Sequence, residues 1–289
     1  LHYKNESGVS LIKRYHFKRN DYLINVTYLI NNQSDSVWEG NFSGKIVRDK
    51  SSDPSTQSSM GMQSFLGMAL SSAEKPYEKY DFDDMLEEPI NNQIQGGWVA
   101  FIQHYFLSAW IPNADIAHTY QTRVKNGLYL MGFISPVTKI EPGETQSVSA
   151  NLYLGPKIIE DLEKIAPNLE LTVDFGFLFW IANPLFWLLN LFFGFVQNWG
   201  IAIILVTVVV KAVFFKLSAA SYRSMANMRR VGPKLKSLKD QYGDDRQKMS
   251  QAMMELYKKE KINPLGGCLP ILVQMPVFIA FYWVLLESV

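Results

Sequence analysis

Lys211 directly follows a long apolar run, and its position limits the chemistry open to this part of the chain. No Asp, Glu, Lys or Arg occurs from residue 175 to residue 210. In a continuous helix Lys211 would lie about 18 Å from Trp199 and about 7 Å from Lys216. A lysine in the middle of a membrane helix costs about 2.5–3.5 kcal/mol, whereas each Leu, Ile or Val returns only about 0.3–0.6 kcal/mol. A cation at that depth therefore needs a source of solvation.

Two placements of the Lys211 ammonium are compatible with the sequence. Its aliphatic stem can reach the cytoplasmic headgroups from this depth, which requires no special environment. Alternatively, the ammonium lies in a hydrated cavity open to the cytoplasm, where it attracts acidic or polar residues of a passing polypeptide. Thr207 lies four residues earlier on the same helix face and would add a hydroxyl to such a cavity. The sequence leaves both placements open.

No catalytic or metal-binding pattern occurs in the sequence. Its four histidines lack metal-ligand spacing, and it has no G-x-S-x-G, His-Glu-x-x-His or P-loop motif. The single cysteine, Cys268, excludes an intrachain disulfide and lies in an apolar segment that keeps its thiol protonated. A small packed side chain explains Cys268 better than a nucleophile does. We therefore expect neither an enzyme nor a bound cofactor or metal.

The elements that must position Lys211 are membrane helices. The composition of the 289 residues, 48% hydrophobic and 19% charged, resembles that of a soluble protein. However, residues 175–210 and 262–286 contain no charged side chain, and about 20 apolar residues of helix are enough to cross a bilayer core. This distribution excludes a protein confined to one aqueous compartment.

Charge divides the chain into two parts of opposite sign. Residues 1–210 hold 15 Lys and Arg against 21 Asp and Glu, a net charge of −6, whereas residues 211–289 hold 13 against 6, a net charge of +7. Most of the latter cations lie between residues 216 and 262. By the positive-inside rule that segment is cytoplasmic. The acidic N-terminal part, residues 1–172, then lies outside the cytoplasm.

Residues 1–172 are predicted to form a β-sandwich or barrel-like domain. Stretches rich in β-branched and aromatic residues cover 22–30, 124–134 and 146–154, and a short helix is expected at 156–165. With about 170 residues, the domain can bury a core without disulfides. Turn-forming pairs separate the strands, namely Asn31-Asn32, Asn91-Asn92, Gly96-Gly97, Asn126-Gly127 and Pro142-Gly143.

Two segments of this domain are predicted to be solvated. Residues 51–72, rich in Ser, Met and Gly, are expected to form an exposed excursion between strands, the alternative being a loop that grips a ligand. An acidic cluster without a neighbouring histidine or a calcium-loop pattern is expected to be a solvated loop and not a metal site. It comprises Asp81, Asp83, Asp84, Glu87 and Glu88.

Two apolar segments follow the β domain. Residues 173–196 are rich in Phe, Trp and Leu and are interrupted by Asn183-Pro184, which fits an amphipathic helix lying in the outer membrane interface. Residues 197–217 are rich in Ile and Val and fit a transmembrane helix, with Trp199 and Lys216 at its two interfaces.

A polar hairpin and a second span complete the chain. Residues 218–262 carry a narrow apolar stripe in each of two arms, which predicts a basic, cytoplasmic coiled-coil hairpin. Asp244 or Asp245 is expected to cap its second helix. Residues 263–289 are predicted to form another transmembrane helix, interrupted by Pro264, Pro270 and Pro276.

Several motifs resemble those of the bacterial YidC membrane-protein insertases. The run Asn263-Pro264-Leu265-Gly266-Gly267-Cys268-Leu269-Pro270, continued by Gln274-Met275-Pro276-Val277-Phe278, resembles the third transmembrane helix of that family. Asn198-Trp199-Gly200 before the Ile/Val-rich segment resembles the second helix. Gly96-Gly97-Trp98-Val99-Ala100 and Ala109-Trp110-Ile111-Pro112 resemble the first periplasmic domain of Gram-negative members. The resemblance covers essentially the whole chain.

The resemblance implies both an architecture and an activity. It implies a periplasmic β-supersandwich, similar in fold to the sugar mutarotases, followed by a helical region in the bacterial inner membrane. It also implies a chaperone-like insertase that moves nascent membrane proteins into the bilayer through a hydrated, positively charged groove open to the cytoplasm, without nucleotide hydrolysis. A first transmembrane helix and several later ones are then expected outside this sequence.

The resemblance also assigns candidate site residues. The implied client groove consists of Lys211, Thr207, Gln274, Met275 and Phe278. The implied recruitment surface of the cytoplasmic hairpin consists of Arg223, Arg229, Arg230, Lys234, Lys236 and Lys239. The family usually has arginine where this chain has Lys211. Because a desolvated lysine can lose its proton and an arginine does not, the groove of this chain must stay hydrated to remain charged.

The implied partners are nascent membrane proteins and the lipid bilayer. A Sec translocon, the ribosome and targeting factors are further candidates, and no specificity for nucleic acid is expected. One alternative from another class is a membrane-anchored module in which the periplasmic domain binds a glycan or protein and the helices only tether it. Another is an enzyme of the mutarotase type, which would need a His/Glu pair in a sheet cleft, with His104 or His118 as the histidine.

Overall fold

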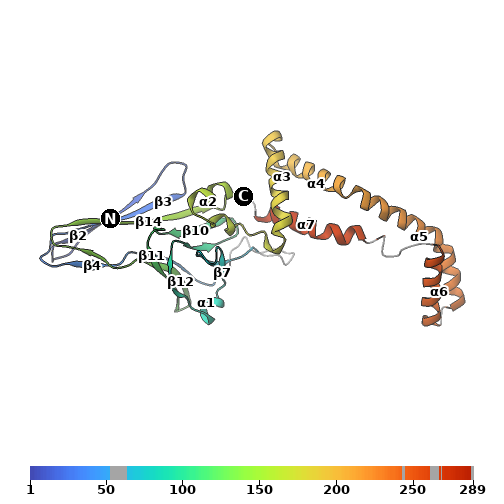
Figure 1. Ribbon diagram of the computed structural model, residues 1–289, viewed down its shortest axis with the longest axis horizontal. Coiled ribbons are helices and arrows are strands. Elements are labelled where there is room, and N and C mark those ends of the chain that lie inside the picture. Colours follow the sequence, from blue (N-terminus) through green and yellow to red (C-terminus); the bar gives the residue numbers. More distant parts are fainter. Residues whose placement is uncertain (53–63, 243–244, 261–266, 268, 288–289) are drawn as a thin grey trace. The chain divides into compact units, whose positions relative to one another are not determined.

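The computed structural model describes residues 1–52, 64–242, 245–260, 267 and 269–287. The described chain forms two compact units. The first is a β-rich unit of residues 1–174 together with the last residues of the chain, from Leu286, and the second is a helical unit of residues 175–285. Figure 1 shows the strands and helices of both units. The prediction of a β-sandwich-like domain followed by a helical region is confirmed.

The β unit contains antiparallel sheets. The larger sheet has the strand order β1-β2-β3-β14-β10-β9-β6-β7, the smaller one has the order β5-β12-β11-β8, and β13 pairs with β4. The strand bounds are β1 His2–Lys4, β2 Val9–His16, β3 Leu23–Asn32, β4 Trp38–Gly40, β5 Ser43–Arg48, β6 Gly67–Ser71, β7 Glu78–Tyr80, β8 Asn91–Gln95, β9 Trp98–Ile102, β10 Phe106–Ile111, β11 Ala117–Lys125, β12 Leu128–Ile134, β13 Thr138–Ile140 and β14 Thr145–Pro156.

Local turn chemistry explains two of the connections. Asn126 and Gly127 both have positive φ, and they join β11 to β12 in the register Lys125↔Leu128. Asn-Gly is the preferred sequence for such a two-residue hairpin because both residues tolerate this conformation. Gly97 also has positive φ, and a Cβ at this position would lie 2.1 Å from the carbonyl oxygen of Ser71. The predicted turns at these two pairs are therefore confirmed.

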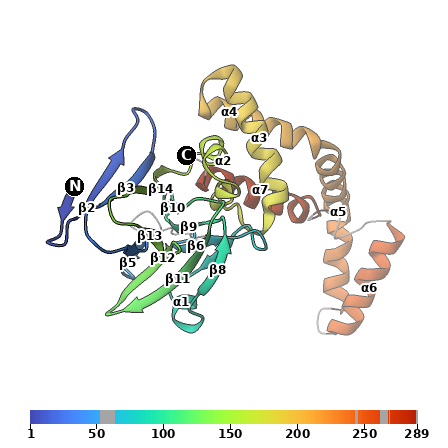
Figure 2. The same cartoon turned by 60° about the vertical axis from the view of Figure 1, so that its left-hand side comes forward.

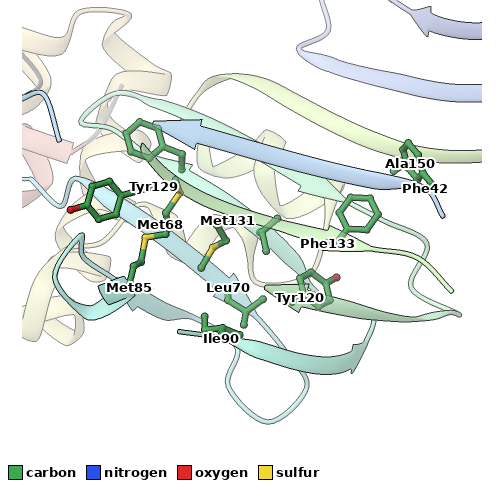
Figure 3. Close-up of a cluster of buried hydrophobic side chains, with 12 residues drawn as sticks. Phe42, Met68, Leu70, Met85, Ile90, Tyr120, Tyr129, Met131, Phe133 and Ala150 are labelled. Carbon is green, nitrogen blue, oxygen red and sulfur yellow. The ribbon is translucent and has the colours of Figure 1, made fainter. Parts of the chain in front are cut away.

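The main core lies between the two larger sheets. Figure 3 shows side chains of both sheets meeting there, among them Met68 and Leu70 of β6 and Met131 and Phe133 of β12. Alternate residues of a strand point to opposite faces, so each strand contributes every second side chain to this cluster. Phe133 has no exposed surface and makes edge-on contacts with neighbouring aromatic rings.

The outer face of the larger sheet is also covered. Every residue of β9 is buried, and the indole nitrogen of Trp98 donates to the carbonyl oxygen of Pro167 at 3.0 Å. Pro167 follows helix α2 (Ile159–Ile165), within the range where a short helix was predicted, and precedes a 3-10 turn, Leu169–Thr172. The segment after β14 therefore folds back over the sheet.

Two predictions about polar segments were wrong. Residues 67–71, part of the predicted exposed excursion, form strand β6, whose residues are all buried because β7 and β9 flank it. Asn91-Asn92 begins strand β8 and Asn31-Asn32 ends strand β3, so neither predicted turn is observed. Residues 53–63 of the excursion lie outside the described residues. The acidic cluster surrounds helix α1 (Asp84–Glu87) and is largely exposed, and no metal-ligand group occurs among the described residues.

The helical unit consists of five helices in its described part. They are α3 Phe179–Val196, α4 Trp199–Val213, α5 Phe215–Tyr242, α6 Arg246–Lys259 and α7 Leu269–Glu287, whose last two residues belong to the β unit. Figure 2 shows α6 beside the end of α5. Pro270 occupies the first turn of α7, where a missing amide proton is tolerated, and Pro276 lies inside the helix. The predicted interruptions at these two prolines are therefore not observed.

The helix boundaries show where the chain changes direction. Gln197 adopts a left-handed conformation that ends α3, and the side chain of Asn198 caps α4 by accepting the amide of Ile201 at 3.1 Å. The predicted uninterrupted helix from Trp199 to residue 217 is not observed, because α4 ends at Val213 and the axis turns by 62° into α5.

Among the described residues, two segments are long and apolar enough to cross a membrane, Gly176–Val196 and Leu269–Glu287. The bent pair α4 and α5 adds a third if it is counted as one span. The first segment is the one predicted to lie in the membrane interface. Length and composition fit either placement, so the interfacial position stays a prediction.

The hairpin has the predicted pairing of two helices. Val231 is buried, and Leu235, Met253 and Leu256 are half-buried along the two arms. The carboxylate of Asp245 caps α6 by accepting the amides of Gln247 and Lys248 at 3.1 Å. Asp244, the other predicted cap, lies outside the described residues, as do Asn263–Gly266 and Cys268.

Candidate functional site

Helix α4 presents Lys211 in its last turn. The partial negative charge at a helix C-terminus favours a cation there. At the other end of α4, Trp199 stacks on Phe193 of α3, with ring centroids 3.8 Å apart and planes 7° apart. A stacked ring pair and a side-chain cap therefore fix the start of the helix that carries the cation.

The ammonium of Lys211 contacts α7. Its Nζ lies 3.4 Å from Oε1 of Gln274 and 5.0 Å from the centre of the Phe278 ring. The first contact is a long, weak hydrogen bond, and the second is a cation–π contact. None of the ion pairs among the described residues includes Lys211. Three of the five predicted groove residues, Lys211 among them, are thus brought together, and no described carboxylate pairs with the cation.

Gln274 is the most enclosed of these residues. It is 8% exposed, its carbonyl oxygen faces Lys211, and its amide nitrogen has no hydrogen-bond partner in the described structure. A buried amide without a partner loses the hydrogen bonds that it makes in water, which costs about 1–3 kcal/mol. The Gln274 side chain therefore holds an uncompensated donor beside its contact with Lys211.

Thr207 and Met275 have different surroundings from the other three. The Thr207 hydroxyl donates to the carbonyl oxygen of Ile203, one turn earlier in its own helix, at 2.8 Å. Its proton is therefore used within α4, and only the lone pairs of its oxygen remain available. Met275 is 52% exposed on α7. No polar contact joins either residue to Lys211 in the described structure.

The predicted recruitment cations lie along α5. All six side chains, Arg223, Arg229, Arg230, Lys234, Lys236 and Lys239, are exposed. Lys234 pairs with Glu260 at 2.6 Å, between α5 and the end of α6. The other five take part in no ion pair with the described carboxylates, so their charges face the solvent.

Ser221 makes a contact that the sequence did not suggest. Its hydroxyl donates to the carbonyl oxygen of Gly267 at 2.7 Å, and Ser221 is buried. This hydrogen bond ties α5 to the chain just before α7. No sequence signal marks it, because a serine in a polar helix is ordinarily solvated.

A groove in the β unit is a second candidate site. It encloses about 630 Å³ beside β14 and is lined by residues that include Asn25, Asn151 and His118. His118 donates or accepts at Nε2 with the carbonyl oxygen of Asn113 at 3.0 Å, and its Nδ1 is buried without a partner. Burial lowers the pKa of His118. The described lining contains no Asp or Glu.

Among the described residues, neither His104 nor His118 is shown beside the carboxylate that mutarotase-type chemistry would need. His118 lacks a carboxylate in its groove, and acid–base catalysis requires a second titratable group within reach of the substrate. His104 stacks on Tyr105, with ring centroids 3.8 Å apart, and its Nε2 lies 2.8 Å from the carbonyl oxygen of Leu286. These contacts show His104 as a packed, hydrogen-bonded side chain of the β unit.

Family models match both units. The model described as YidC periplasmic domain matches residues 1–188, and the model described as 60Kd inner membrane protein matches residues 191–289. Together the two matches cover nearly the entire chain.

Relatives named membrane protein insertase YidC align with the chain end to end. The protein from Marinobacter nauticus is 62% identical over 289 residues, covering 100% of this chain and 51% of its own length. The protein from Hahella chejuensis is 63% identical over 285 residues, covering 98% and 50% respectively. The chain therefore spans about half the length of the curated relatives it matches.

Similarity to solved structures is much weaker. A galactose mutarotase-like protein from Lactobacillus casei overlaps 53% of this chain and 68% of its own, with a TM-score of 0.37 and 11% identity. This likeness is too low to assign a sheet topology or an activity.

Proposed function

Since the chain belongs to the YidC family of inner-membrane proteins, we propose that it takes part in inserting nascent membrane proteins into the lipid bilayer. The client groove lies between α4 and α7, around Lys211, Gln274 and Phe278. The observation that carries this proposal is the Lys211 ammonium, which contacts an amide and an aromatic ring and no described carboxylate. A cation left without a counter-charge can attract a polar or acidic client segment.

Energetics support a groove that works without nucleotide hydrolysis. An apolar client helix of about 20 residues gains about 0.3–0.6 kcal/mol for each Leu, Ile, Phe or Val, whereas one charged residue in its translocated tail costs about 2.5–3.5 kcal/mol at the bilayer centre. The helix thus supplies enough free energy once the tail has a path that avoids hydrocarbon. Hydration around Lys211 and Gln274 would provide that path.

Two predicted groove residues of α7 fit a role in apolar contact with the client. Met275 and Phe278 expose 52% and 44% of their surface on α7, where they offer apolar contact area to a passing helix. Methionine adapts its shape to varied partners because its side chain is unbranched and polarizable. Nascent membrane proteins and the bilayer are therefore the proposed partners, with the basic face of α5 as the surface that recruits ribosomal, targeting or translocon components.

The proposed topology follows the charge distribution. Residues 1–172 lie in the periplasm and residues 218–262 in the cytoplasm, where the exposed cations of α5 satisfy the positive-inside rule. Residues 173–196 lie in the outer interface, and residues 197–217 and 263–289 cross the membrane.

Substitution of Lys211 in the full-length protein tests this function. Lys211→Ala should lower insertion of clients with acidic translocated tails about tenfold, and Lys211→Arg should preserve it because the charge remains. Lys216→Ala is the matched control, since Lys216 is exposed near Lys211. Unchanged insertion by Lys211→Ala would contradict the groove and favour a lysine that only reaches the headgroups.

Crosslinking locates the client directly. Photoreactive residues at positions 207, 211, 275 and 278 should capture a stalled nascent membrane protein. A probe at the exposed residue Lys164 of the β unit serves as the control and should capture none. Equal capture at all positions would contradict a client path between α4 and α7.

The groove of the β unit favours a second role, that of a periplasmic binding module. Its volume of about 630 Å³ and the unpartnered Nδ1 of His118 would suit a small polar ligand. Ser149→Trp would fill the groove from an exposed position on β14. If insertion continues unchanged in that variant, the groove and the insertion path are separate, whereas complete loss of function would favour the binding module.

A further inference from the structure

Helices α4 and α5 of the helical unit meet at a bend that the local sequence does not explain. Their axes differ by 62°, and Phe214, the residue between them, has φ −89° and ψ 8°. An α-helix has ψ near −42°, so a change of about 50° in one torsion angle would straighten the chain. Sharp bends usually occur at proline, at glycine and serine pairs or where a side chain enters the hydrogen-bond ladder. Residues 211–217 contain no proline, glycine or serine.

Backbone hydrogen bonds continue on both sides of the bend. The amide of Phe214 donates to the carbonyl oxygen of Val210 at 3.2 Å, and the carbonyl oxygen of Phe214 accepts the amide of Ser218 at 3.0 Å. The local backbone thus tolerates the bend without requiring it. A contact farther along the chain must therefore hold α5 in its bent direction.

Ser221, two turns beyond the bend, makes such a contact. It is 5% exposed, although the residues that follow it in α5, Tyr222 and Arg223, are exposed. Its hydroxyl donates to the carbonyl oxygen of Gly267 at 2.7 Å, which is the most common length of an O–H···O hydrogen bond. Both partners belong to the helical unit. The buried hydroxyl therefore ties α5 to the residue that comes two positions before α7.

The absence of a side chain at Gly267 allows α5 to approach this closely. A Cβ at this position would lie 3.3 Å from Cγ of Met225, slightly closer than the usual separation of two carbon atoms. Met225 lies one turn after Ser221 on the same face of α5. Two side chains of one helix face thus hold the chain directly before α7, one by a hydrogen bond and one by packing.

The contact at Ser221 and the contact at Lys211 lie on opposite sides of the bend. Before the bend, Lys211 of α4 contacts Gln274 of α7. After the bend, Ser221 of α5 contacts Gly267. The groove contact is a long hydrogen bond at 3.4 Å, whereas the bond at Ser221 is shorter and its donor is buried. The contact at Ser221 is therefore the better suited of the two to fix the start of α7.

We propose that Ser221 is a positioning residue, whose hydrogen bond to Gly267 holds the bend at Phe214 and fixes the start of α7. Gln274, seven residues after Gly267, thereby stays beside Lys211. Ser221 itself does not touch the client. The inference rests on the function proposed above, because the groove around Lys211 is the site that the bend positions.

Two substitutions of nearly equal shape test the hydroxyl alone in the full-length protein. Ser221→Thr retains a hydroxyl donor, whereas Ser221→Val has none. Any cost of the added bulk is common to both, so the difference between them reports the hydrogen bond. Ser221→Ala removes the hydroxyl without added bulk and should behave as Ser221→Val does. Ser237→Ala is the control, because Ser237 is an exposed serine of α5 whose hydroxyl donates within its own helix, to the carbonyl oxygen of Lys234.

The first readout is the angle of the bend. Spin labels carried by non-natural amino acids replace Ile201 of α4 and Gln241 of α5, which are both exposed, and leave Cys268 in place. The two backbone positions would be about 53 Å apart across a 62° bend and about 60 Å apart in a straight helix. The wild type, the control and Ser221→Thr should give one narrow distribution at the shorter distance. Ser221→Val and Ser221→Ala should give a distribution that extends to the longer distance.

The second readout is insertion of a client with an acidic translocated tail. Ser221→Val should lower insertion at least threefold relative to Ser221→Thr, because Gln274 is no longer held beside Lys211. Thermal unfolding of the same samples checks that the variants are folded. Ser237→Ala should insert the client as the wild type does.

An unchanged distance distribution in both Ser221→Val and Ser221→Ala would overturn the inference. If Lys211→Ala still impairs insertion in that case, the proposed function stands and only the role of Ser221 fails. If the distance lengthens while insertion falls with Lys211→Ala and not with Ser221→Val, the bend does not position the groove, and the inference is likewise overturned. Insertion that is insensitive to Lys211→Ala would contradict the proposed function itself.

Discussion

Two lysines, one in each unit, differ in burial and in the charge of their neighbours. Lys157 of the β unit is enclosed, and its Nζ lies 2.8 Å from a carboxylate. Lys211 of the helical unit has an exposed side chain whose Nζ contacts an amide oxygen at 3.4 Å and an aromatic ring at 5.0 Å. The first charge is neutralised within the protein, and the second remains available to another molecule.

The same difference extends to the rest of the two units. In the β unit, buried side chains such as Met131 and Phe133 interlock in a core between sheets. In the helical unit, Met275 and Phe278 are partly exposed, and Phe278 lies beside a cation. A tightly packed core contributes to the free energy of unfolding, whereas exposed apolar and charged side chains can bind another molecule. Substitutions in the β unit should therefore change stability, and substitutions in the helical unit should change client binding.

The largest expected difference concerns the two lysines. Lys157→Met leaves the carboxylate of Glu287 buried without its cation and should lower the free energy of unfolding by about 3–5 kcal/mol. Lys211→Met removes an exposed charge and should change it by about 0.5 kcal/mol or less. Urea-dependent pulse proteolysis of the full-length protein measures both. Equal losses of stability would show that the two lysines do not differ as the structure indicates.

The two methionines provide a matched pair of smaller effect. Met131 is 1% exposed, and Met131→Ala should lower the stability of the β unit by about 2–4 kcal/mol through lost packing and a cavity. Met275 is 52% exposed, and Met275→Ala should leave stability within about 0.5 kcal/mol while reducing client crosslinking. If Met275→Ala destabilises the protein, Met275 contributes to packing within the unit, and the proposal that it contacts the client is contradicted.

The two units should also differ in their response to mild acid. Burial lowers the pKa of His118, so below about pH 6.5 the unfolded chain binds a proton that the folded β unit resists. The stability that neutral His118 contributes is therefore present above about pH 6.5 and is lost as the pH falls below that value. His118→Gln should reduce this loss, measured by thermal unfolding at several pH values. Residues 175–289 contain no histidine, and the helical unit should show little change over the same range.

The smallest expected effect is local to the hairpin. Hydrogen bonds from the backbone and side chain of Lys248, together with the Gln247 amide, lower the pKa of Asp245. The contribution of this cap is therefore present above the ordinary Asp pKa of about 3.9 and is lost as the pH falls through and below it. Asp245→Ala should speed hydrogen exchange in the first turn of α6 at neutral pH, whereas Asp240→Ala should not. Equal rates of hydrogen exchange in the two variants would contradict the proposed role of Asp245 as a helix cap.

Local sequence was sufficient where neighbouring residues determine the conformation. Asn126-Gly127 predicted its hairpin because only residues tolerant of positive φ form that turn. Asp245 predicted a helix start because a short carboxylate satisfies first-turn amides. Lys211 could be singled out from the sequence because a charged residue at the end of a long apolar run is costly to place in a membrane.

Local sequence failed where distant segments determine burial. Residues 67–71 were predicted to be exposed, yet they form a fully buried strand because β7 and β9 enclose them. The bend at Phe214 was missed because no proline or glycine marks it. The partner of Lys211 was predicted only through family resemblance, and its contact distance depends on how α4 and α7 pack.

By itself, the sequence determined that this protein has an acidic β domain, apolar segments of membrane length and a basic polar hairpin, because hydropathy and charge are properties of contiguous residues. Only the tertiary structure decided which side chains meet. Lys157 and Glu287 are separated by 130 positions, and nothing in either segment indicates the other. Their pairing depends on the complete fold of the β unit, since a buried charge is stable only where the fold delivers its partner.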